Sequence, residues 1–506
     1  MPSLLLGVDV GTTAVKAVLV DQSGHIVSEG RSEYATTHLQ IGWVEQDPLD
    51  WWKSFCQSVK LALEAAPGSS ISAIAISSQA PTLIAVDASG NPLRNAMIWM
   101  DRRAEGEAQE IAKKFSNISE LTGNRADPYY VAAKIKWYVK NEPNNYQKTK
   151  YFLQIPGYLN FKLTGKFSID SAHASLLQLR SADNSGWADE IMKFVGVSED
   201  KFPQIGKATE LLAVVTENNG SVIPAGVPVY FGTVDGCSAA VEAGVIDPGV
   251  VAEMTGTSTV LIMPTDGNNF NDAFVAIEHA IDGRQLRLGA MVASGASVQW
   301  LHQTVLKEQI SLDDLSNLAQ SVPAGCEGLI FLPYMMGERS PIWNSNARGV
   351  FFGLSLTTTP AMMFRAVLEG TAFALAHNVE LARKSGIRID EIRSIGGGSK
   401  SKLWNQIKAD VLGIPIVILQ DSNGAAVGDA YLAGIGSGIF TDIRSTLKSN
   451  IKIESKYQPQ QAVHTYYLER YARFRSLYES LKNEFDYSAV SAEYKVGSES
   501  IYNCQI

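Results

Sequence analysis

Short apolar runs, each interrupted by a Gly-Thr turn, open the chain and return near its middle. Residues 4–10 are apolar, residues 11–13 read Gly-Thr-Thr, and residues 14–21 form a second apolar run. No helical periodicity follows this glycine, so the pattern predicts antiparallel strands rather than the strand-turn-helix start of a dinucleotide-binding fold. A similar order of strand, turn and strand surrounds residues 255–258, Thr-Gly-Thr-Ser. We therefore expect a weak internal repeat with a domain boundary near residue 245.

Other segments follow the periods of helices or buried strands. Asp47 followed by Pro48 is a helix-start signal, because Asp caps the free amides and Pro suits the first helical position. Helices are expected at 47–65, 101–115, 132–141, 238–243 and 360–385, and further strands at 26–33, 71–77, 83–87, 227–232, 249–253 and 259–263. The predicted organisation is an N-terminal domain over 1–245, a C-terminal domain over 246–485, and a polar tail without pattern over 486–506.

Composition narrows the class of protein. The chain has 506 residues, of which 45% are hydrophobic and 19% charged, which is ordinary for a globular protein with large cores. Its net charge is -9, and the sequence has no long run of charges of one sign. This acidic balance argues against nucleic acid as a partner, because neutralising phosphates needs clustered Lys and Arg. An acidic chain can still hold a phosphate group through backbone amides and a metal ion.

Cysteine usage and the N-terminus point to the cytoplasm. The four cysteines form no Cys-x-x-Cys pair, so neither a disulfide framework nor a thiolate zinc site is expected. The first apolar run is short, lacks a basic flank and meets an acid at Asp9, which predicts a buried strand rather than a signal peptide. No apolar stretch is long enough to predict a membrane span.

The first Gly-Thr turn carries candidate phosphate-binding chemistry. Gly11 allows close approach to a ligand, and the backbone amides and the hydroxyls of Thr12 and Thr13 are donors for anionic oxygens. Asp9, at the strand end, can hold magnesium directly or through water. The alternative is an ordinary hairpin with a buried Asp. A second such turn, at residues 255–258, favours two turns that enclose a phosphate chain from both sides.

Asp235 is a candidate general base. It follows a predicted strand and precedes a helix of small residues, where a carboxylate can take a proton from an attacking hydroxyl. The local sequence by itself favours a simpler role, the N-cap of that helix. The two roles are compatible.

A run of three glycines, Gly396, Gly397 and Gly398, stands between a predicted strand and a helix. It leaves room for a flat ring or a ribose, although a tight connection is the plainer interpretation. The chain lacks the GxxxxGK[ST] phosphate loop, and a Gly434-x-Gly436-x-Gly438 run follows an alanine-rich helix rather than a strand.

As a set, these motifs resemble the FGGY carbohydrate kinases in order and spacing. They are Asp9 to Thr13, Asp235-Gly236, Thr255 to Ser258, Gly337-Glu338-Arg339-Ser340-Pro341 and Gly396 to Ser399. The resemblance covers roughly residues 3–480. It implies an α/β fold of two ribonuclease-H-like domains of the actin, hexokinase and Hsp70 type around a central cleft, with MgATP mostly on the second domain and the sugar mostly on the first.

The resemblance also implies roles for individual residues. Asp235 becomes the base that deprotonates the sugar hydroxyl, and Asp9 organises Mg²⁺. The residues it assigns to ATP are Thr12, Thr13, Lys16, Gly256, Thr257, Gly295, Gln299, Gly397, Gly398, Ser399 and Lys402. Lys402 stands where the family often has a neutral residue.

The sugar side departs from the family pattern. Gln79 belongs to a strand-end motif that xylulose kinases usually continue with Met-His and glycerol kinases with Arg-Glu. Here Ala80-Pro81 follows, and neither residue offers a polar side chain. The predicted sugar-side residues are Gln79, Ala80, Trp99, Asp101, Arg102, Tyr129 and Asp235. Core packing is the alternative for Trp99 and Tyr129.

The implied reaction is transfer of the ATP γ-phosphoryl group to a primary hydroxyl of a small sugar or polyol. Residues 127–137 are close to the glycerol-kinase pattern and residues 337–354 to the xylulose-kinase pattern. A pentulose such as xylulose is the expected acceptor. Glycerol, ribulose, gluconate or a tetritol, a non-catalytic sugar sensor, and a conformational ATPase remain as alternatives. The family resemblance also implies a homodimer.

Overall fold

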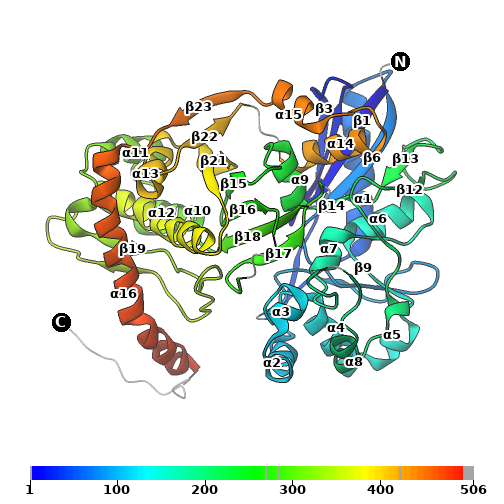
Figure 1. Cartoon of the computed structure of the whole chain (residues 1–506), viewed down its shortest axis with the longest axis horizontal. Helices are drawn as coiled ribbons and strands as arrows, with labels where there is room; N and C mark the ends of the chain where they lie inside the picture. The colour runs from blue at the N-terminus through cyan, green and yellow to red at the C-terminus, as the bar shows by residue number, and fades with distance from the viewer. Residues whose placement is uncertain are drawn as a thin grey trace.

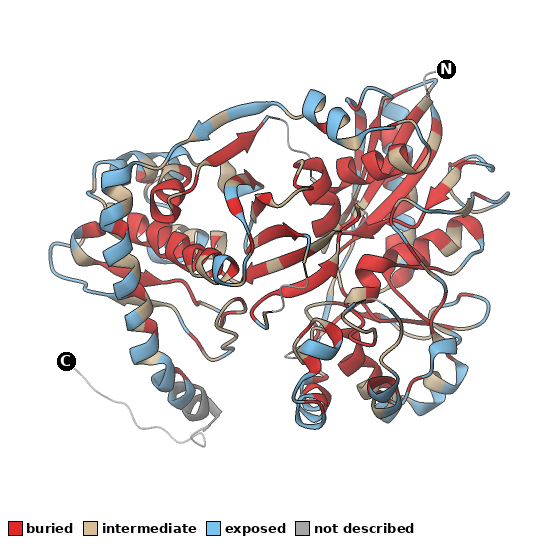
Figure 2. Cartoon of the chain, in the orientation of Figure 1, coloured by how far each residue is buried: buried red, intermediate tan, exposed pale blue. Residues whose placement is uncertain are grey.

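Two mixed sheets, one in each half of the chain, form the frame of the molecule (Figure 1). The computed structural model describes residues 3–40, 42–183, 185–267, 271–281, 284–420 and 424–493. Figure 2 shows that the sheets and the helices against them carry most of the buried residues.

The first sheet has the order β12-β13-β6-β1-β2-β3, and β14 also pairs with β6. Its strands are β1 (Ser3–Val10), β2 (Ala14–Val20), β3 (Ile26–Glu33), β6 (Ser70–Ser78), β12 (Leu211–Val214), β13 (Pro228–Tyr230) and β14 (Thr233–Val234). β1 is antiparallel to β2 and parallel to β6, so Asp9 stands level with Lys16 on one side and Ser77 on the other.

The second sheet repeats this arrangement in the order β17-β18-β16-β15-β21-β22-β23. Its strands are β15 (Gly249–Thr255), β16 (Thr259–Thr265), β17 (Val275–Glu278), β18 (Gln285–Met291), β21 (Ile389–Ile395), β22 (Ile416–Leu419) and β23 (Ile453–Tyr457). β15 is antiparallel to β16 and parallel to β21, as β1 is to β2 and β6. The expected repeat is therefore confirmed, and the two Gly-Thr turns occupy equivalent hairpins.

Helices cover the faces of both sheets. α1 (Pro48–Ala65) packs on β2 and β3, with Asp47 as its N-cap as the sequence predicts. α12 (Pro360–Lys384), α13 (Lys402–Leu412) and α16 (Gln461–Glu493) lie against one another beside the second sheet. α12 is buried at every position from Phe364 to Ala376, and α13 at nearly every position from Trp404 to Leu412, so both are core helices enclosed by their neighbours.

One helix from the second half of the chain lies on the first sheet. α14 (Ala425–Gly436) contacts β1 and β6 and the helix α9 (Asp235–Glu242). Gly7 and Gly428 permit this approach, because a Cβ atom at either position would overlap a backbone carbonyl of the facing element. The boundary expected near residue 245 stays a prediction, but α14 means that the second half also covers the first sheet.

The remaining elements surround the two sheets and connect their strands (Figure 1). In the first half they are β4 (Thr37–Gln40), β5 (Trp43–Gln46), β7 (Ile84–Val86), β8 (Ala96–Met97), α2 (Glu105–Lys114), α3 (Ile118–Thr122), α4 (Val131–Asn141), α5 (Pro143–Lys148), β9 (Tyr151–Leu153), α6 (Ile155–Thr164), β10 (Ile169–Asp170), α7 (Ser171–Ser175), α8 (Asp189–Val195) and β11 (Ile205–Gly206). In the second half they are α10 (Gly295–Gln299), α11 (Leu312–Gln320), β19 (Ile330–Leu332), β20 (Val350–Phe352) and α15 (Ile443–Asn450).

Side chains of the first half also meet the edge of the second sheet. The amide of Asn124 donates to the carbonyl of Ala276 at 3.0 Å and accepts from its N–H at 2.8 Å. Two positions along β17, the N–H of Glu278 donates to the hydroxyl of Ser175 on α7. These contacts join the two halves of the chain along the side of β17 that lies opposite to β18.

Three expectations need correction. The helix expected from Asp101 begins only at Glu105, because Asp101 is held by other contacts described below. Asp235 is not an N-cap: the cap position falls on Val234, and Asp235 is the first helical residue. The polar tail expected from residue 486 is wrong in its first part, since α16 continues to Glu493; residues 494–506 lie outside the described ranges.

Among the described helices, none is both long and apolar enough to cross a bilayer.

Candidate active site

The first Gly-Thr turn joins β1 to β2, and hydrogen bonds to its carbonyl oxygens fix it in place. Tyr34 donates its hydroxyl to the carbonyl of Gly11, and Gln46 donates to that of Thr12 at 2.8 Å. The indole N–H of Trp99 lies 3.4 Å from the Thr12 hydroxyl. Thr13 is exposed. With the carbonyls tied down and Thr13 exposed, the turn is fixed in place and open to a ligand.

The second turn lies against the start of α10. Gly256 and Thr257 are exposed, and the N–H of Ala296 donates to the carbonyl of Thr257 at 2.9 Å. A Cβ atom at Gly295 would overlap the carbonyl of Gly256, so glycine is required for this close approach. The turn predicted to hold phosphate and the helix predicted to contact nucleotide are thus adjacent.

The triple glycine completes this surface. Gly396 has a φ of 83°, which favours glycine, and a Cβ there would meet the carbonyl of Thr255 at 2.7 Å. Gly397 is exposed. Lys402, which follows the glycine run, and Gln299, which follows Gly295, are exposed as well. The structure therefore brings together three of the predicted nucleotide segments, around residues 256, 295 and 397.

A buried polar network supports these loops from the core. Glu253 on β15 pairs with Lys408 on α13 at 2.8 Å, and both side chains are almost fully buried. Thr255 donates to Glu253 and lies 2.7 Å from the Thr259 hydroxyl, which in turn is 2.6 Å from that of Ser294. The network ties the second turn to α10 and α13.

Three carboxyl groups meet at the end of the first sheet. The hydroxyl of Ser77 lies 2.6 Å from Asp429 Oδ2 and 3.3 Å from Asp9 Oδ1. Ser238, one turn into α9, donates to the other oxygen of Asp429. Asp235, at the start of α9, accepts from its own neighbour Gly236 at 2.6 Å.

The pKa values of these acids are raised because the carboxylates are removed from water. Burial, reinforced by the nearby charge of Asp235, raises the pKa of Asp9 to about 7, against the hydrogen bond from Ser77 and the charge of Lys16. Burial raises the pKa of Asp235 to about 6, which the Gly236 N–H and His173 oppose. Burial also raises the pKa of Asp429 well above its usual range. Perturbed acids that face one another are a common feature of catalytic sites.

The predicted sugar-side residues adjoin this cluster. Gln79 follows β6, donates to Gln46 at 2.7 Å, and keeps an Oε1 atom that is buried without a hydrogen-bond partner. Tyr129 donates its hydroxyl to the carbonyl of Ala80 at 2.8 Å, and burial raises the pKa of this hydroxyl while the charge of Arg339 lowers it. Lys134, itself buried, donates to the carbonyls of Pro128 and Tyr129 and so fixes the loop that carries Tyr129.

Arg339 reaches the same place from the second half of the chain. Its guanidinium lies 5.6 Å from the ring centre of Trp99 and 5.9 Å from that of Tyr129. Its neighbour Glu338 is buried and accepts from the N–H groups of Val292 and Arg339, both at 2.8 Å. These bonds fix the loop, so a cation from one half stands over two aromatic rings from the other.

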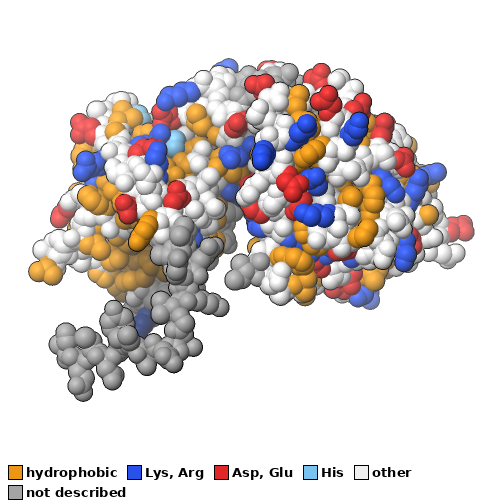
Figure 3. Space-filling view, turned by 90° about the horizontal axis from the view of Figure 1, so that it is seen from below, with side chains coloured by type: hydrophobic (Ala, Val, Ile, Leu, Met, Phe, Trp, Pro, Cys, Tyr) orange, Lys and Arg blue, Asp and Glu red, His pale blue; other side chains and the backbone are white. Residues whose placement is uncertain are grey.

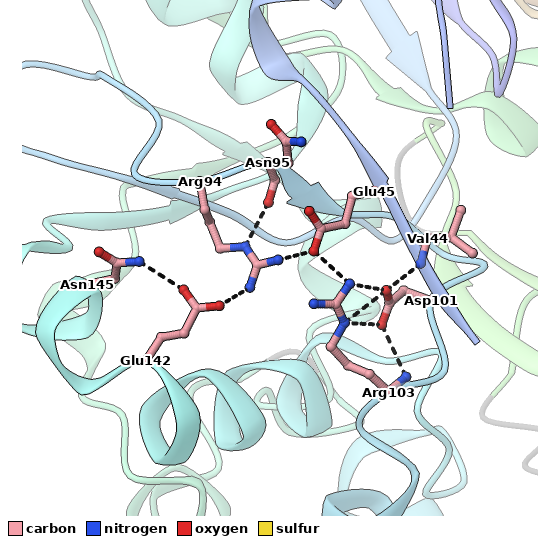
Figure 4. Close-up of polar contacts among 8 residues, drawn as sticks. All are labelled: Val44, Glu45, Arg94, Asn95, Asp101, Arg103, Glu142 and Asn145. Carbon is pink, nitrogen blue, oxygen red and sulfur yellow. Dashed lines mark hydrogen bonds and ion pairs between the residues drawn. The ribbon is translucent and has the colours of Figure 1, made fainter. Parts of the chain in front are cut away.

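Asp101 belongs to a buried ion-pair cluster instead (Figure 4). Its carboxylate accepts from the N–H of Val44 at 2.7 Å and from the guanidinium of Arg103 at 2.6 Å. Arg103 lies 3.9 Å from the ring centre of Trp43 and also pairs with Glu45, which Arg94 contacts in turn. With protein donors on both oxygens and no exposed surface, Asp101 is not supported as a sugar contact by this geometry.

Arg102 and Lys16 keep part of their surface open. Arg102 pairs with Asp127 at 2.7 Å and is 40% exposed along its side chain. Lys16 pairs with Glu29 at 2.9 Å and lies level with Asp9. Each of the two therefore already has an acidic partner in the protein, and Lys16 also lies beside Asp9 of the carboxyl group cluster.

Several residues of the site were missed from the sequence. Asp429 and His173 were not considered, and Arg339 was quoted only as part of a motif. Asp429 left a signal: it is an acid within the apolar helix α14, where a polar residue needs a reason to be buried. His173 left none that local spacing reveals.

Both domain profiles of one family match the chain. The profile described as the FGGY family of carbohydrate kinases, N-terminal domain, matches residues 4–242, and that of the C-terminal domain matches residues 251–437. The chain is 28% identical to a xylulose kinase of Staphylococcus xylosus, over 94% of this chain and 99% of that protein.

Another relative is named for a different acceptor. The chain is 32% identical to a glycerol kinase of Bdellovibrio bacteriovorus, over 91% of this chain and 96% of that protein. Among solved structures, a xylulose kinase of Rhodospirillum rubrum aligns with a TM-score of 0.89 at 27% identity, covering 96% of this chain and 100% of the other.

Proposed function

Because the chain belongs to the FGGY family of carbohydrate kinases, we propose that it transfers the γ-phosphoryl group of ATP to a primary hydroxyl of a pentulose such as xylulose. The observation that carries the proposal is the position of Asp235. It starts α9 next to Asp9 and the first Gly-Thr turn, and its charge acts on Tyr129 of the sugar side. A base is needed at this junction between donor and acceptor.

In the proposed mechanism, Asp235 accepts the proton of the acceptor hydroxyl as that oxygen attacks phosphorus. A base helps only if it is ionised and within hydrogen-bond reach of the proton. With a pKa of about 6, Asp235 is mostly ionised at neutral pH and still basic enough to bind a proton. The two turns position the phosphate chain through their amides, and positioning with charge neutralisation supplies most of the rate in phosphoryl transfer.

The residues present fit MgATP. The bare backbones of Gly256 and Gly397 face open space, where no side chain would meet a ligand. Asp9 would hold Mg²⁺ from the end of β1, beside the first Gly-Thr turn. Such a site suits magnesium, which usually takes one or two carboxylates together with phosphates and water. MgATP, when bound, supplies the transferable phosphoryl group.

On the sugar side, Gln79, Trp99, Tyr129 and Arg339 would contact the acceptor. The unpartnered Oε1 of Gln79 can accept from a sugar hydroxyl. Ala80 contributes a backbone carbonyl, already bonded to Tyr129, in place of a polar side chain. The proposal places the reaction in the cytoplasm, where free thiols such as Cys56 stay reduced.

A screen of ADP release over ketopentoses, pentitols, tetritols, glycerol and gluconate tests the proposal. We expect the highest kcat/KM with a ketopentose such as D-xylulose. Asp235→Asn should keep ATP binding and lose about 10²- to 10⁴-fold in kcat. Near-normal turnover in this variant, or ATP consumption that no sugar stimulates, would contradict the assignment.

Glycerol is the second candidate acceptor. The observation in its favour is the 32% identity to a glycerol kinase, together with a tyrosine, Tyr129, placed at the sugar side. The same screen separates the two, since a glycerol kinase would show its highest kcat/KM with glycerol.

A further inference from the structure

A buried chain of acid, histidine and serine lies behind Asp235. The ring Nδ1 of His173 lies 2.6 Å from Asp170 Oδ2, and its Nε2 lies 3.3 Å from the hydroxyl of Ser78. Asp170 ends β10, His173 belongs to α7 and Ser78 ends β6. The exposed fractions are 2% for Asp170 and zero for His173 and Ser78.

The register of the first sheet brings this chain to the base. Val234 on β14 pairs with Ser78 on β6, and Asp235 is the next residue after Val234. α7 packs against β14, so the imidazole that contacts Ser78 stands at the strand end that Asp235 continues. His173 is also one of the groups that lower the pKa of Asp235.

The partners of the ring are oxygen atoms on both sides. Asp170 accepts at Oδ1 from the backbone N–H of His173 and offers Oδ2 to the ring Nδ1. The Ser78 hydroxyl donates its single proton to the carbonyl of Gln79 at 2.9 Å, a shorter contact than the one to His173, and so leaves its oxygen to face Nε2 as an acceptor. This arrangement fits a ring that donates from both nitrogens, and the proposal below takes the ring in that form.

Other ionisable groups also face these residues. Around α7 they are Glu278 on β17, which hydrogen-bonds Ser171, and Cys237 on α9, whose pKa burial raises. Around Asp235 they are Asp9 and Tyr129. Cations act on these neighbours too: Lys16 on Asp9, Arg339 on Tyr129, and Arg180 and Lys207 on Glu278. The charge that acts on Asp235 itself is that of His173.

We propose that Asp170 and His173 act as a positioning pair, which places a fixed positive charge behind Asp235 and keeps its carboxylate ready to accept a proton. This inference rests on the proposed role of Asp235 as the base. The proton of the acceptor hydroxyl goes to Asp235 and leaves the site from there; His173 keeps both of its protons throughout. Asp170 holds the imidazolium, and Ser78 fixes its distance from the strand end.

The pH profile of kcat/KM with D-xylulose and saturating MgATP tests the pair. The acid limb of the profile is the fall in kcat/KM at low pH as Asp235 takes up a proton. In His173→Asn this limb should move up by about one pH unit, because an opposite charge nearby favours the ionised carboxylate. Asp170→Asn should move it in the same direction, and ATP affinity should stay unchanged in both. His464→Asn, which removes a histidine bound to the carbonyl of Asp410 on the second half, is the matched control and should leave the limb in place.

A spectroscopic measurement needs no acceptor. In the ¹⁵N-histidine spectrum of the full chain at pH 7, both ring nitrogens of His173 should show protonated shifts, assigned by the signal lost in His173→Gln. A neutral ring at pH 7, or an acid limb that stays in place in a folded His173→Asn, would overturn the inference. Asp235→Asn separates the two proposals: full turnover there rejects the base itself, whereas an inactive Asp235→Asn with an unmoved limb in His173→Asn rejects only the pair.

Discussion

Asp429 accepts a hydrogen bond from Ser238, although 191 positions separate them in the chain. Its other oxygen accepts from Ser77, which also neighbours Asp9. Through these two serines, a helix from the second half of the chain holds both the strand that flanks Asp9 and the helix that begins with Asp235.

Asp429→Ala should therefore weaken both stability and turnover. The substitution leaves the buried hydroxyl of Ser238 without its acceptor and leaves Ser77 with the longer contact to Asp9, and an unsatisfied buried group costs about 1–3 kcal/mol. We expect a lower Tm and a lower kcat with little change in the KM for ATP. Asp313→Ala, on the exposed face of α11, is the control and should change neither. A wild-type kcat in folded Asp429→Ala would contradict this expectation, because Asp9 and Asp235 would then keep their positions without Asp429.

The raised pKa values of Asp9 and Asp235 predict an unusual dependence of stability on pH. Each folded pKa exceeds its unfolded value of 3.8, so the folded state binds the proton more tightly. The contribution of each group is most favourable below about pH 4. It is lost as the pH rises to about 6 for Asp235 and about 7 for Asp9.

Asp235→Asn should consequently stabilise the protein at pH 8. The expected gain is on the order of 1–2 kcal/mol, and it should shrink toward pH 4, where the wild-type group is neutral in the fold. Urea unfolding at both pH values measures it. Asp390→Asn, at an exposed position on β21, is the control. An equal effect at both pH values would mean that Asp235 is not buried in its charged form.

Breaking the Glu253–Lys408 pair should be costly. Lys408→Met leaves Glu253 buried without its cation, which costs about 3–5 kcal/mol. The double variant Glu253→Gln with Lys408→Met should recover part of that loss, because no charge stays unpaired. Since the network ties the second Gly-Thr turn to α10 and α13, the KM for ATP should rise in the single variant. Equal stability of the single and double variants would contradict the pairing.

Asp101→Asn distinguishes a structural role from the sugar contact that the sequence suggests. The structure leads us to expect a loss of about 3–5 kcal/mol in unfolding free energy, because Arg103 loses a buried partner. The KM for the acceptor should change less than twofold in the folded fraction. A stable variant with a strongly raised acceptor KM would restore the original prediction. Arg94→Lys serves as a second probe of the same cluster.

Arg339→Lys should affect the acceptor and spare the nucleotide. The planar guanidinium over Trp99 and Tyr129 is poorly replaced by an ammonium group. A loss of about 1 kcal/mol in stacking corresponds to roughly a fivefold rise in the acceptor KM. ATP affinity, measured by titration calorimetry, should be unchanged. Arg388→Lys, at an exposed position on the same half, is the matched control.

The parts of the fold that depend on neighbouring residues could be predicted from the sequence. The apolar runs around Gly11 and Gly256 define their strands because alternation and turn residues act locally. Asp47 and Pro48 mark a helix start for the same reason. The close approach of the loops at Gly295 and Gly396 is also readable, since glycines that let backbones touch are visible in the sequence itself. The binding of nucleotide by these loops stays a prediction.

The acceptor side could not be predicted to the same degree. Arg339 meets Trp99 across the two halves, and Asp429 meets Ser77 over 352 positions, so no local pattern reports either contact. The ion pair of Asp101 could not be foreseen because its partner Arg103 lies two residues away in a loop, where no spacing rule reports a salt bridge. The helix predicted over 238–243 begins at Asp235, so the residue expected as its N-cap is its first helical residue.

The amide of Asn124 takes the place that another strand would occupy beside β17. Its paired hydrogen bonds to Ala276 saturate both backbone groups of an edge residue, as a neighbouring strand would. Without this amide, the backbone groups of Ala276 would be open to pairing with another chain. Asn124 therefore protects the edge of the second sheet from edge-to-edge association, with Ser175 doing the same at Glu278.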